Sequence, residues 1–69
     1  MEYRKALAIL LKERKMTQAD LARRTGMSRS YVSQLMSGKI KEPTLSMAFD
    51  IADALEVTVQ DFRKLMEND

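Results

Sequence analysis

The chain has 69 residues, of which 45% are hydrophobic, with a formal net charge of +2 and neither cysteine nor histidine. A chain this short has material for one domain only, and the missing residue types exclude disulfides, thiolate zinc sites and a histidine general base. We therefore expect a single domain over residues 1–69, no enzyme activity and no cofactor. The apolar run at residues 6–11 is too short to span a membrane and no signal peptide is evident, so a cytoplasmic protein is expected.

The charges are divided unevenly along the sequence. Residues 1–41 hold ten Lys/Arg and three Asp/Glu, a net charge of +7, whereas residues 42–69 hold two and seven, a net charge of −5. This asymmetry predicts a first part that binds a polyanion and a second part that is turned away from it. The alternative interpretation is that both charge runs are ordinary solvated faces.

The first predicted element is a helix over residues 3–14. Its apolar residues recur at helical spacing on one face, namely Tyr3, Ala6, Leu7, Leu10 and Leu11, while Ile9 lies outside that stripe. The second predicted helix begins after Thr17 as N-cap, with Asp20 at the third helical position in a capping-box arrangement, and ends at Gly26. Both helices are typical of a small all-α fold.

Three more helices are expected. The third begins after the Ser28 cap and ends at Gly38, and the fifth runs from the Thr58 cap to about Met66. The fourth follows Pro43 and the cap residue Thr44, and its predicted inner face consists of Leu45, Ala48, Phe49, Ala52 and Leu55. The connections are a few residues long, so the chain is predicted to form a compact five-helix bundle whose core includes Leu21, Val32, Leu35, Phe49 and Leu55.

The third helix separates polar from apolar residues. At about 100° per residue, with Arg29 at zero, Ser33 falls near 40°, whereas Leu35 lies near 240°. Ser30 and Gln34 fall on the Arg29 side, and Val32 on the Leu35 side. A guanidinium, an amide and two hydroxyls on one face suit hydrogen bonding to base edges in a major groove. An amphipathic helix with a merely solvated polar face explains the wheel equally well.

The order of these segments resembles a known family. The sequence reads TQADLA at 17–22, TGMS at 25–28, YVSQL at 31–35 and SGK at 37–39, followed by PTL at 43–45 and IADALEV at 51–57. In this order and spacing they resemble the helix-turn-helix of the phage repressor and Cro type, the XRE family, over roughly residues 7–65. The resemblance implies that the predicted second and third helices bind DNA.

The resemblance also assigns roles to individual residues. It places Arg29, Ser30 and Gln34 on base edges, with Ser33 as a weaker fourth. The residues that it places on the sugar-phosphate backbone are Thr17, Gln18, Ser28, Tyr31, Ser37, Lys39 and Lys41. For Tyr31, covering the edge of the core is an equally good interpretation.

Two positions depart from the family pattern. Relatives often carry an Arg and a Glu as an internal ion pair where this chain has Leu11 and Met36, so a hydrophobic contact is expected in its place. Lys15 stands where relatives often have Gly at the end of the first helix. Lys can enter the left-handed region only at some energetic cost, so a different turn is an open alternative here.

The resemblance implies a transcriptional regulator, most simply a repressor, whose partner is double-stranded DNA. One recognition helix reads few base pairs, so a homodimer on an inverted-repeat operator is expected, with Val57, Val59, Arg63 and Met66 at its interface. No membrane association and no small-molecule ligand are expected. The alternative is an antitoxin or adaptor of the same fold whose partner is a protein, held by Ile9 and the acidic surface of the last two helices.

Overall fold

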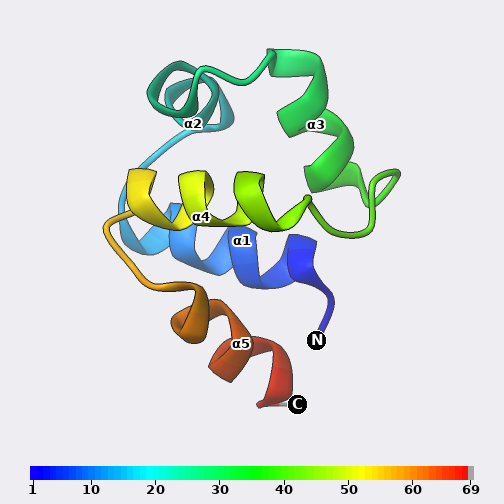
Figure 1. Cartoon of the computed structure of the whole chain (residues 1–69), viewed down its shortest axis with the longest axis vertical. Helices are drawn as coiled ribbons and strands as arrows, with labels where there is room; N and C mark the ends of the chain where they lie inside the picture. Colours follow the sequence, from blue (N-terminus) through cyan, green and yellow to red (C-terminus); the bar gives the residue numbers. More distant parts are fainter. Residues whose placement is uncertain (69) are drawn as a thin grey trace.

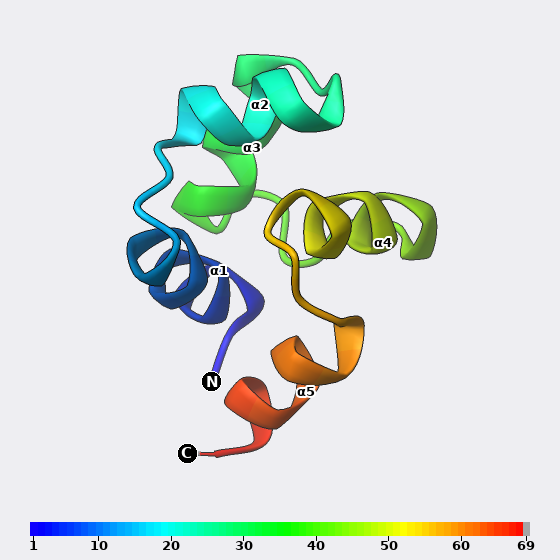
Figure 2. The same ribbon diagram turned by 90° about the vertical axis from the view of Figure 1, so that its left-hand side faces the viewer.

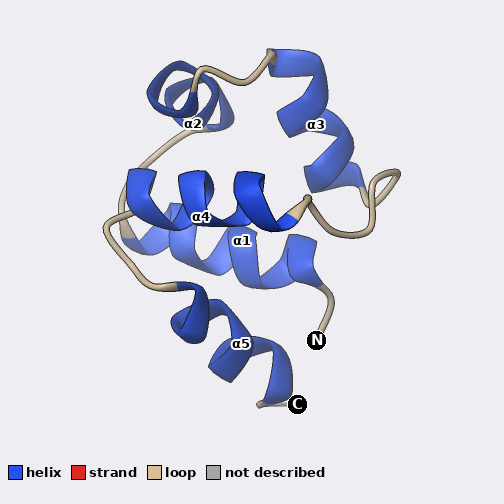
Figure 3. Cartoon of the chain, viewed as in Figure 1, coloured by secondary structure: helices blue, strands red, loops and turns tan. Residues whose placement is uncertain are grey.

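The computed structural model describes residues 1–68, which form five α-helices. Figure 3 shows helices joined by short loops and no strand in this part of the chain, which confirms the predicted all-α fold. The helices are α1 (Tyr3–Glu13), α2 (Gln18–Thr25), α3 (Arg29–Ser37), α4 (Leu45–Ala54) and α5 (Val59–Glu67).

The helices form a bundle with α2 and α3 at one end and α5 at the other. Figure 1 shows α4 crossing in front of α1 between these two ends, and the view in Figure 2 separates α1 from α4 and shows α5 beneath both. Accordingly, α3 packs on α1 and α2, while α5 packs on α1 and α4. The end made by α2 and α3 therefore lies opposite the end that carries α5.

The helix boundaries follow the predicted caps. The Thr17 hydroxyl accepts a hydrogen bond from the Asp20 N–H at 3.0 Å, and the Asp20 carboxylate accepts one from the Thr17 N–H at 3.0 Å. Thr58 and Asp61 form the same capping box at the start of α5, at 3.1 and 2.9 Å. Because these side chains satisfy N–H groups that lack an intrahelical partner, they fix where each helix begins.

Within residues 1–68, four residues have a left-handed backbone conformation, and each lies at or just after the end of a helix. Gly26 ends α2 with φ 77° and Gly38 ends α3 with φ 86°, as the sequence predicts. Lys15 has φ 55°, so this lysine adopts the left-handed conformation that glycine favours, and Glu56 does the same with φ 58°. The Arg14 guanidinium donates to the Glu56 carbonyl at 3.3 Å, so the α1–α2 turn is tied to the α4–α5 turn.

The core lies where the helices meet. Leu21, Val32, Leu35 and Leu55 are fully buried, as predicted. At the α1–α5 contact, the Tyr3 ring stacks on Phe62 with 4.9 Å between the ring centroids. The Tyr3 hydroxyl is buried and has no hydrogen-bond partner among the described residues, and this burial raises the pKa of the phenol.

The predicted inner face of α4 is wrong at two positions. Leu45 is 69% exposed and Phe49 is 52% exposed, whereas Ile51, which the prediction omitted, is fully buried. Apolar residues cover a broad arc of α4. Because this helix packs between α2 and α5, the part of the arc centred on Ile51 and Leu55 is buried. The sequence pattern alone could not identify that part of the arc.

The structure also tests what the sequence predicted for Leu11, Met36 and Ile9. Leu11 is buried and Met36 is half-buried against the core, so both occupy apolar surroundings where relatives carry the ion pair. Ile9 is half-buried rather than exposed, which removes much of the surface expected of it. No helix in residues 1–68 has the length and apolarity needed to cross a membrane.

Candidate nucleic-acid interface

Helix α3 turns its two sides to different surroundings. Val32 and Leu35 on one side are fully buried, which anchors the helix in the core. On the other side Arg29, Ser30 and Ser33 are exposed and Gln34 is half-buried. The structure thus brings together the four side chains that the sequence assigned to base edges, and it presents them on the surface.

Two of these four side chains are coupled by a hydrogen bond. The Gln34 amide donates to the Ser30 hydroxyl at 3.1 Å, across one turn of the helix. An amide carries two N–H donors and one carbonyl acceptor, so the bond to Ser30 leaves one N–H and the carbonyl for a ligand. Ser30 therefore orients Gln34 in addition to presenting its own hydroxyl.

The start of α2 lies beside this side of α3. Gln18 lines a surface hollow of ≈ 350 Å³ together with Arg29, Ser30 and Ser33. The sequence assigned Gln18 to the phosphate backbone, whereas the structure places it next to the base-reading candidates. It therefore extends the exposed polar surface from one helix of the helix-turn-helix to the other.

The cap of α2 holds a carboxylate near this surface. Backbone and side-chain hydrogen bonds with Thr17, together with the Arg23 guanidinium at 2.8 Å, lower the pKa of Asp20 to about 2. The Thr17 oxygen accepts the Asp20 N–H, so the two residues satisfy each other's groups at the start of α2. The exposed Ser28 hydroxyl caps α3 in the same way, by accepting from the Tyr31 N–H at 3.0 Å.

The segment after α3 supplies the basic residues. Lys39 and Lys41 are exposed, as phosphate contacts require. The Ser37 hydroxyl donates to the Gln34 carbonyl at 3.2 Å and accepts from the Lys39 N–H at 3.3 Å, so it closes the turn that presents Lys39. Tyr31 is half-buried and packs against the core, in keeping with the core-edge interpretation of this residue.

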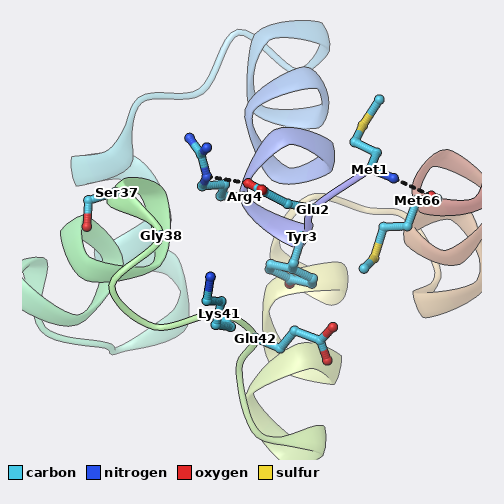
Figure 4. A pocket seen from close by; sticks show the side chains of 9 residues that line it. All are labelled: Met1, Glu2, Tyr3, Arg4, Ser37, Gly38, Lys41, Glu42 and Met66. Carbon is cyan, nitrogen blue, oxygen red and sulfur yellow. Dashed lines mark hydrogen bonds and ion pairs between the residues drawn. The ribbon is translucent and has the colours of Figure 1, made fainter. Parts of the chain in front are cut away.

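The structure adds one basic residue that the sequence patterns did not single out. Arg4, in the first turn of α1, lies against Gly38 and lines a notch of ≈ 300 Å³ with Ser37 and Lys41. Figure 4 shows Arg4 and Lys41 on the two sides of the Gly38 turn. Nothing local in the sequence indicates this contact, because Arg4 and Gly38 are brought together only by the packing of α1 on α3.

The expected dimer residues lie on α5 and in the turn before it, and one of them, Met66, also lines the notch beside Arg4. Val57, Val59 and Met66 are half-buried and Arg63 is exposed. A groove of ≈ 520 Å³ between α4 and α5 is lined by Val59, Arg63 and Met66, and the exposed Leu45 also lines it. The apolar surface available there is therefore larger than the C-terminal residues alone provide.

The sequence was compared with known protein families and with curated proteins. A profile of the helix-turn-helix family matches residues 7–62, which is most of the chain and includes all five helices at least in part. No curated protein matches the sequence. The family profile thus covers α2, α3 and the turn between them, together with most of the polar surface described above. The chain therefore belongs to the XRE/Cro/C1-type helix-turn-helix family of DNA-binding transcriptional regulators.

Proposed function

We propose that the protein is a cytoplasmic, sequence-specific repressor that inserts α3 into the major groove of duplex DNA. The observation that carries this proposal is the division of α3 between the buried Val32 and Leu35 and the exposed Arg29, Ser30 and Ser33. The residues 1–69 act as one DNA-binding unit without a cofactor, and occupation of promoter DNA by this unit is sufficient to block transcription.

The side chains of α3 have the donors and acceptors that base edges require. Arg29 can donate two parallel hydrogen bonds to O6 and N7 of a guanine. Gln34, with one N–H engaged by Ser30, keeps one donor and one acceptor, which match N7 and the N6 amino group of an adenine. We therefore assign a guanine to Arg29 and an adenine to Gln34 within each half-site.

Backbone contacts on both sides of the groove set the register of α3. Thr17, Gln18 and the Ser28 cap lie at helix N-termini, where free N–H groups and the helix dipole attract a phosphate. Lys39 and Lys41 approach the backbone at the other end of α3, with the Ser37 turn holding Lys39 in place. Such contacts supply affinity on any sequence, whereas the base contacts supply the discrimination.

Substitutions on α3 and after it test this division of labour. Arg29→Ala or Gln34→Ala is expected to cost about 1–3 kcal/mol on the selected site and to relax the base preference there, with little effect on random duplex DNA. Lys39→Ala is the matched control, because it should weaken both DNAs alike and lower the salt slope by about 1 unit. Equal weakening of selected and random DNA by Arg29→Ala would contradict the assignment of a base contact. The selected site itself comes from enrichment of a random duplex library at a stated salt concentration.

The second part of the proposal is a homodimer formed through α4 and α5. Leu45 and Phe49 are one turn apart on α4 and both are exposed, and Leu45 lines the groove together with Val59 and Met66. A second copy is the occupant that fits best, because two half-sites are needed for a specific operator and a two-fold axis at α5 keeps both α3 helices outward. The acidic character of this part of the chain keeps the surface away from phosphates.

Charge insertion into this surface tests the dimer. Leu45→Asp should abolish cooperative binding to an inverted repeat and retain the fold, because the side chain is 69% exposed. Val59→Asp should act in the same direction, and Gln60→Asp is the control that adds one negative charge at an exposed α5 position outside the groove. The readout is the number of chains on the selected DNA, and one chain on an asymmetric site would contradict the proposal.

The exposed Leu45 and Phe49 also suit the second candidate function, an antitoxin or adaptor whose main partner is a different protein. The two candidates differ in their response to salt. Binding to DNA through Lys and Arg weakens steeply as salt rises, whereas a complex held by apolar contacts does not. A salt-resistant protein complex combined with salt-independent, weak DNA binding would favour the second candidate.

A further inference from the structure

The notch at the end of α3 is not explained by the family match. Arg4 lies outside the matched residues 7–62, yet its side chain reaches the turn that ends the recognition helix. A β-carbon built on Gly38 would lie 3.1 Å from Cδ and Nε of Arg4, so the Arg4 stem occupies the space that any larger residue would need. Gly38 therefore ends α3, and its lack of a side chain leaves the space that Arg4 occupies.

The notch is continuous with the side of α3 that we assign to DNA. Counted from Arg29 at about 100° per residue, Ser37 falls near 80°, in the middle of the sector occupied by Arg29, Ser33, Ser30 and Gln34. It lies about 12 Å further along the helix axis. The notch therefore extends the polar side of α3 past its C-terminal end, next to Lys41, which is already proposed to contact the phosphate backbone.

The charges around the notch leave Arg4 available to an anion. Glu2 accepts a hydrogen bond from Nε of Arg4 at 2.7 Å, which lowers the pKa of that carboxyl and fixes the plane of the guanidinium. Within residues 1–68 the terminal nitrogens of Arg4 make no hydrogen bond. Lys41 extends toward Arg4 in Figure 4, whereas the second carboxylate of the notch, on Glu42, points away from Arg4.

We propose that Arg4, held by Glu2 over Gly38, is an additional phosphate-binding residue that acts together with Lys41 at the exit of the recognition helix. A guanidinium presents two N–H groups in a fixed fork that fits two phosphate oxygens, which Lys cannot do. This inference rests on the proposed function, because it takes the DNA backbone as the anion. It adds α1 to the DNA interface, beyond the helix-turn-helix itself.

The test is the salt dependence of DNA binding by Arg4→Gln, which keeps the stem against Gly38 and removes the charge. Loss of one phosphate contact should lower the slope of log K against log salt by about 0.9 for each bound chain. The unmodified protein should then lose about 3- to 4-fold more affinity per chain than Arg4→Gln between about 50 and 200 mM salt, on selected and random duplexes alike.

Two further variants separate a DNA contact from a structural role. Arg4→Lys should retain the slope and lose affinity, because the charge remains and the fork does not. Lys64→Gln removes the same charge from an exposed α5 position that does not line the notch, and should leave both slope and affinity unchanged. A slope for Arg4→Gln equal to that of the unmodified protein, with unchanged melting temperature, would overturn the inference and leave the proposed function standing. Failure of the unmodified protein to bind any duplex would overturn both.

Discussion

The helices of the α2–α3 end and of the α4–α5 surface begin with the same kind of capping hydrogen bond. The two regions nevertheless expose different side chains. Thr17 and Thr58 cap α2 and α5 with matching capping boxes. Yet α3 buries its apolar residues and exposes polar ones, whereas α4 leaves Leu45 and Phe49 in contact with solvent. Local hydrogen bonding therefore determines where helices begin, and it does not determine what each helix leaves uncovered.

Charge follows the same division. The first 41 residues carry a net +7 and supply α2, α3 and the lysines beyond them, while the remaining residues carry −5 and supply α4 and α5. A cationic, hydrogen-bonding surface suits a polyanion, and an apolar surface with acidic surroundings suits a protein. The contrast supports the proposed function, in which one part of the domain contacts DNA and another contacts a second copy.

The largest expected effect compares one buried and one exposed apolar residue. Leu35→Ala should cost about 2–5 kcal/mol of the free energy of unfolding, since it opens a cavity beneath α3 in a domain whose total stability is about 5–15 kcal/mol. Phe49→Ala should cost less than about 1 kcal/mol, because about half of this residue is already exposed. Urea unfolding monitored by circular dichroism measures both, and similar losses for the two variants would show that Phe49 is packed more deeply than the structure indicates.

The next largest effect is expected from replacing the two glycines at the helix ends, and it concerns both stability and DNA affinity. Gly26→Ala and Gly38→Ala should each cost about 1–2 kcal/mol, because both residues have left-handed backbones. A β-carbon at Gly26 meets no atom within 4 Å, whereas at Gly38 it presses on Arg4 at 3.1 Å. The Gly38 variant should therefore also weaken DNA binding beyond its effect on stability. Binding at a temperature where both variants are fully folded separates the two effects, and equal affinities would argue against a role for the notch.

The predictable part of the structure is the local part. The caps at Thr17, Ser28, Thr44 and Thr58 each involve residues three apart, so the sequence contains all the information they need. The exposure of Phe49 depends on how α4 rotates between α2 and α5, and its apolar arc is too broad to specify that rotation. The Arg4 contact depends on residues 34 positions apart in the numbering of the chain, which no spacing rule anticipates.

A smaller effect is expected from the two non-glycine residues with positive φ. Glu56→Gly and Lys15→Gly should each stabilise the fold by up to about 1 kcal/mol, because glycine avoids the left-handed strain and part of this gain is offset by the entropy of the unfolded chain. The main-chain carbonyl that accepts from Arg14 is retained in Glu56→Gly. Thermal unfolding at matched protein concentration measures the change, and destabilisation by both variants would show that their side chains, rather than their backbones, matter.

The smallest effect is expected when the pH is lowered, and it distinguishes the two capping boxes by the pKa of their carboxyl groups. Asp20 has its pKa lowered from the usual 3.8 to about 2, first by the Thr17 backbone N–H and then by the hydrogen bond from Arg23. Asp61 has its pKa lowered mainly by hydrogen bonds from Thr58, with smaller contributions from the charges of Lys64 and Arg14. A carboxyl whose pKa is lower in the folded state stabilises the fold above its unfolded pKa. That contribution is lost as the pH falls through the folded value, here from about 4 toward 2 for Asp20.

Because the Arg23 contribution is screened by salt, raising the salt concentration should move the pKa of Asp20 upward toward that of Asp61, whose shift comes mainly from short hydrogen bonds. Carboxyl carbon chemical shifts followed by NMR from pH 6 to pH 1.5, at low and high salt, measure both groups in one experiment. Arg23→Gln provides the control, since it should bring Asp20 close to Asp61 at either salt concentration. If Asp20 still titrates well below Asp61 in that variant, the difference between the two boxes comes from the helix termini themselves rather than from the added guanidinium.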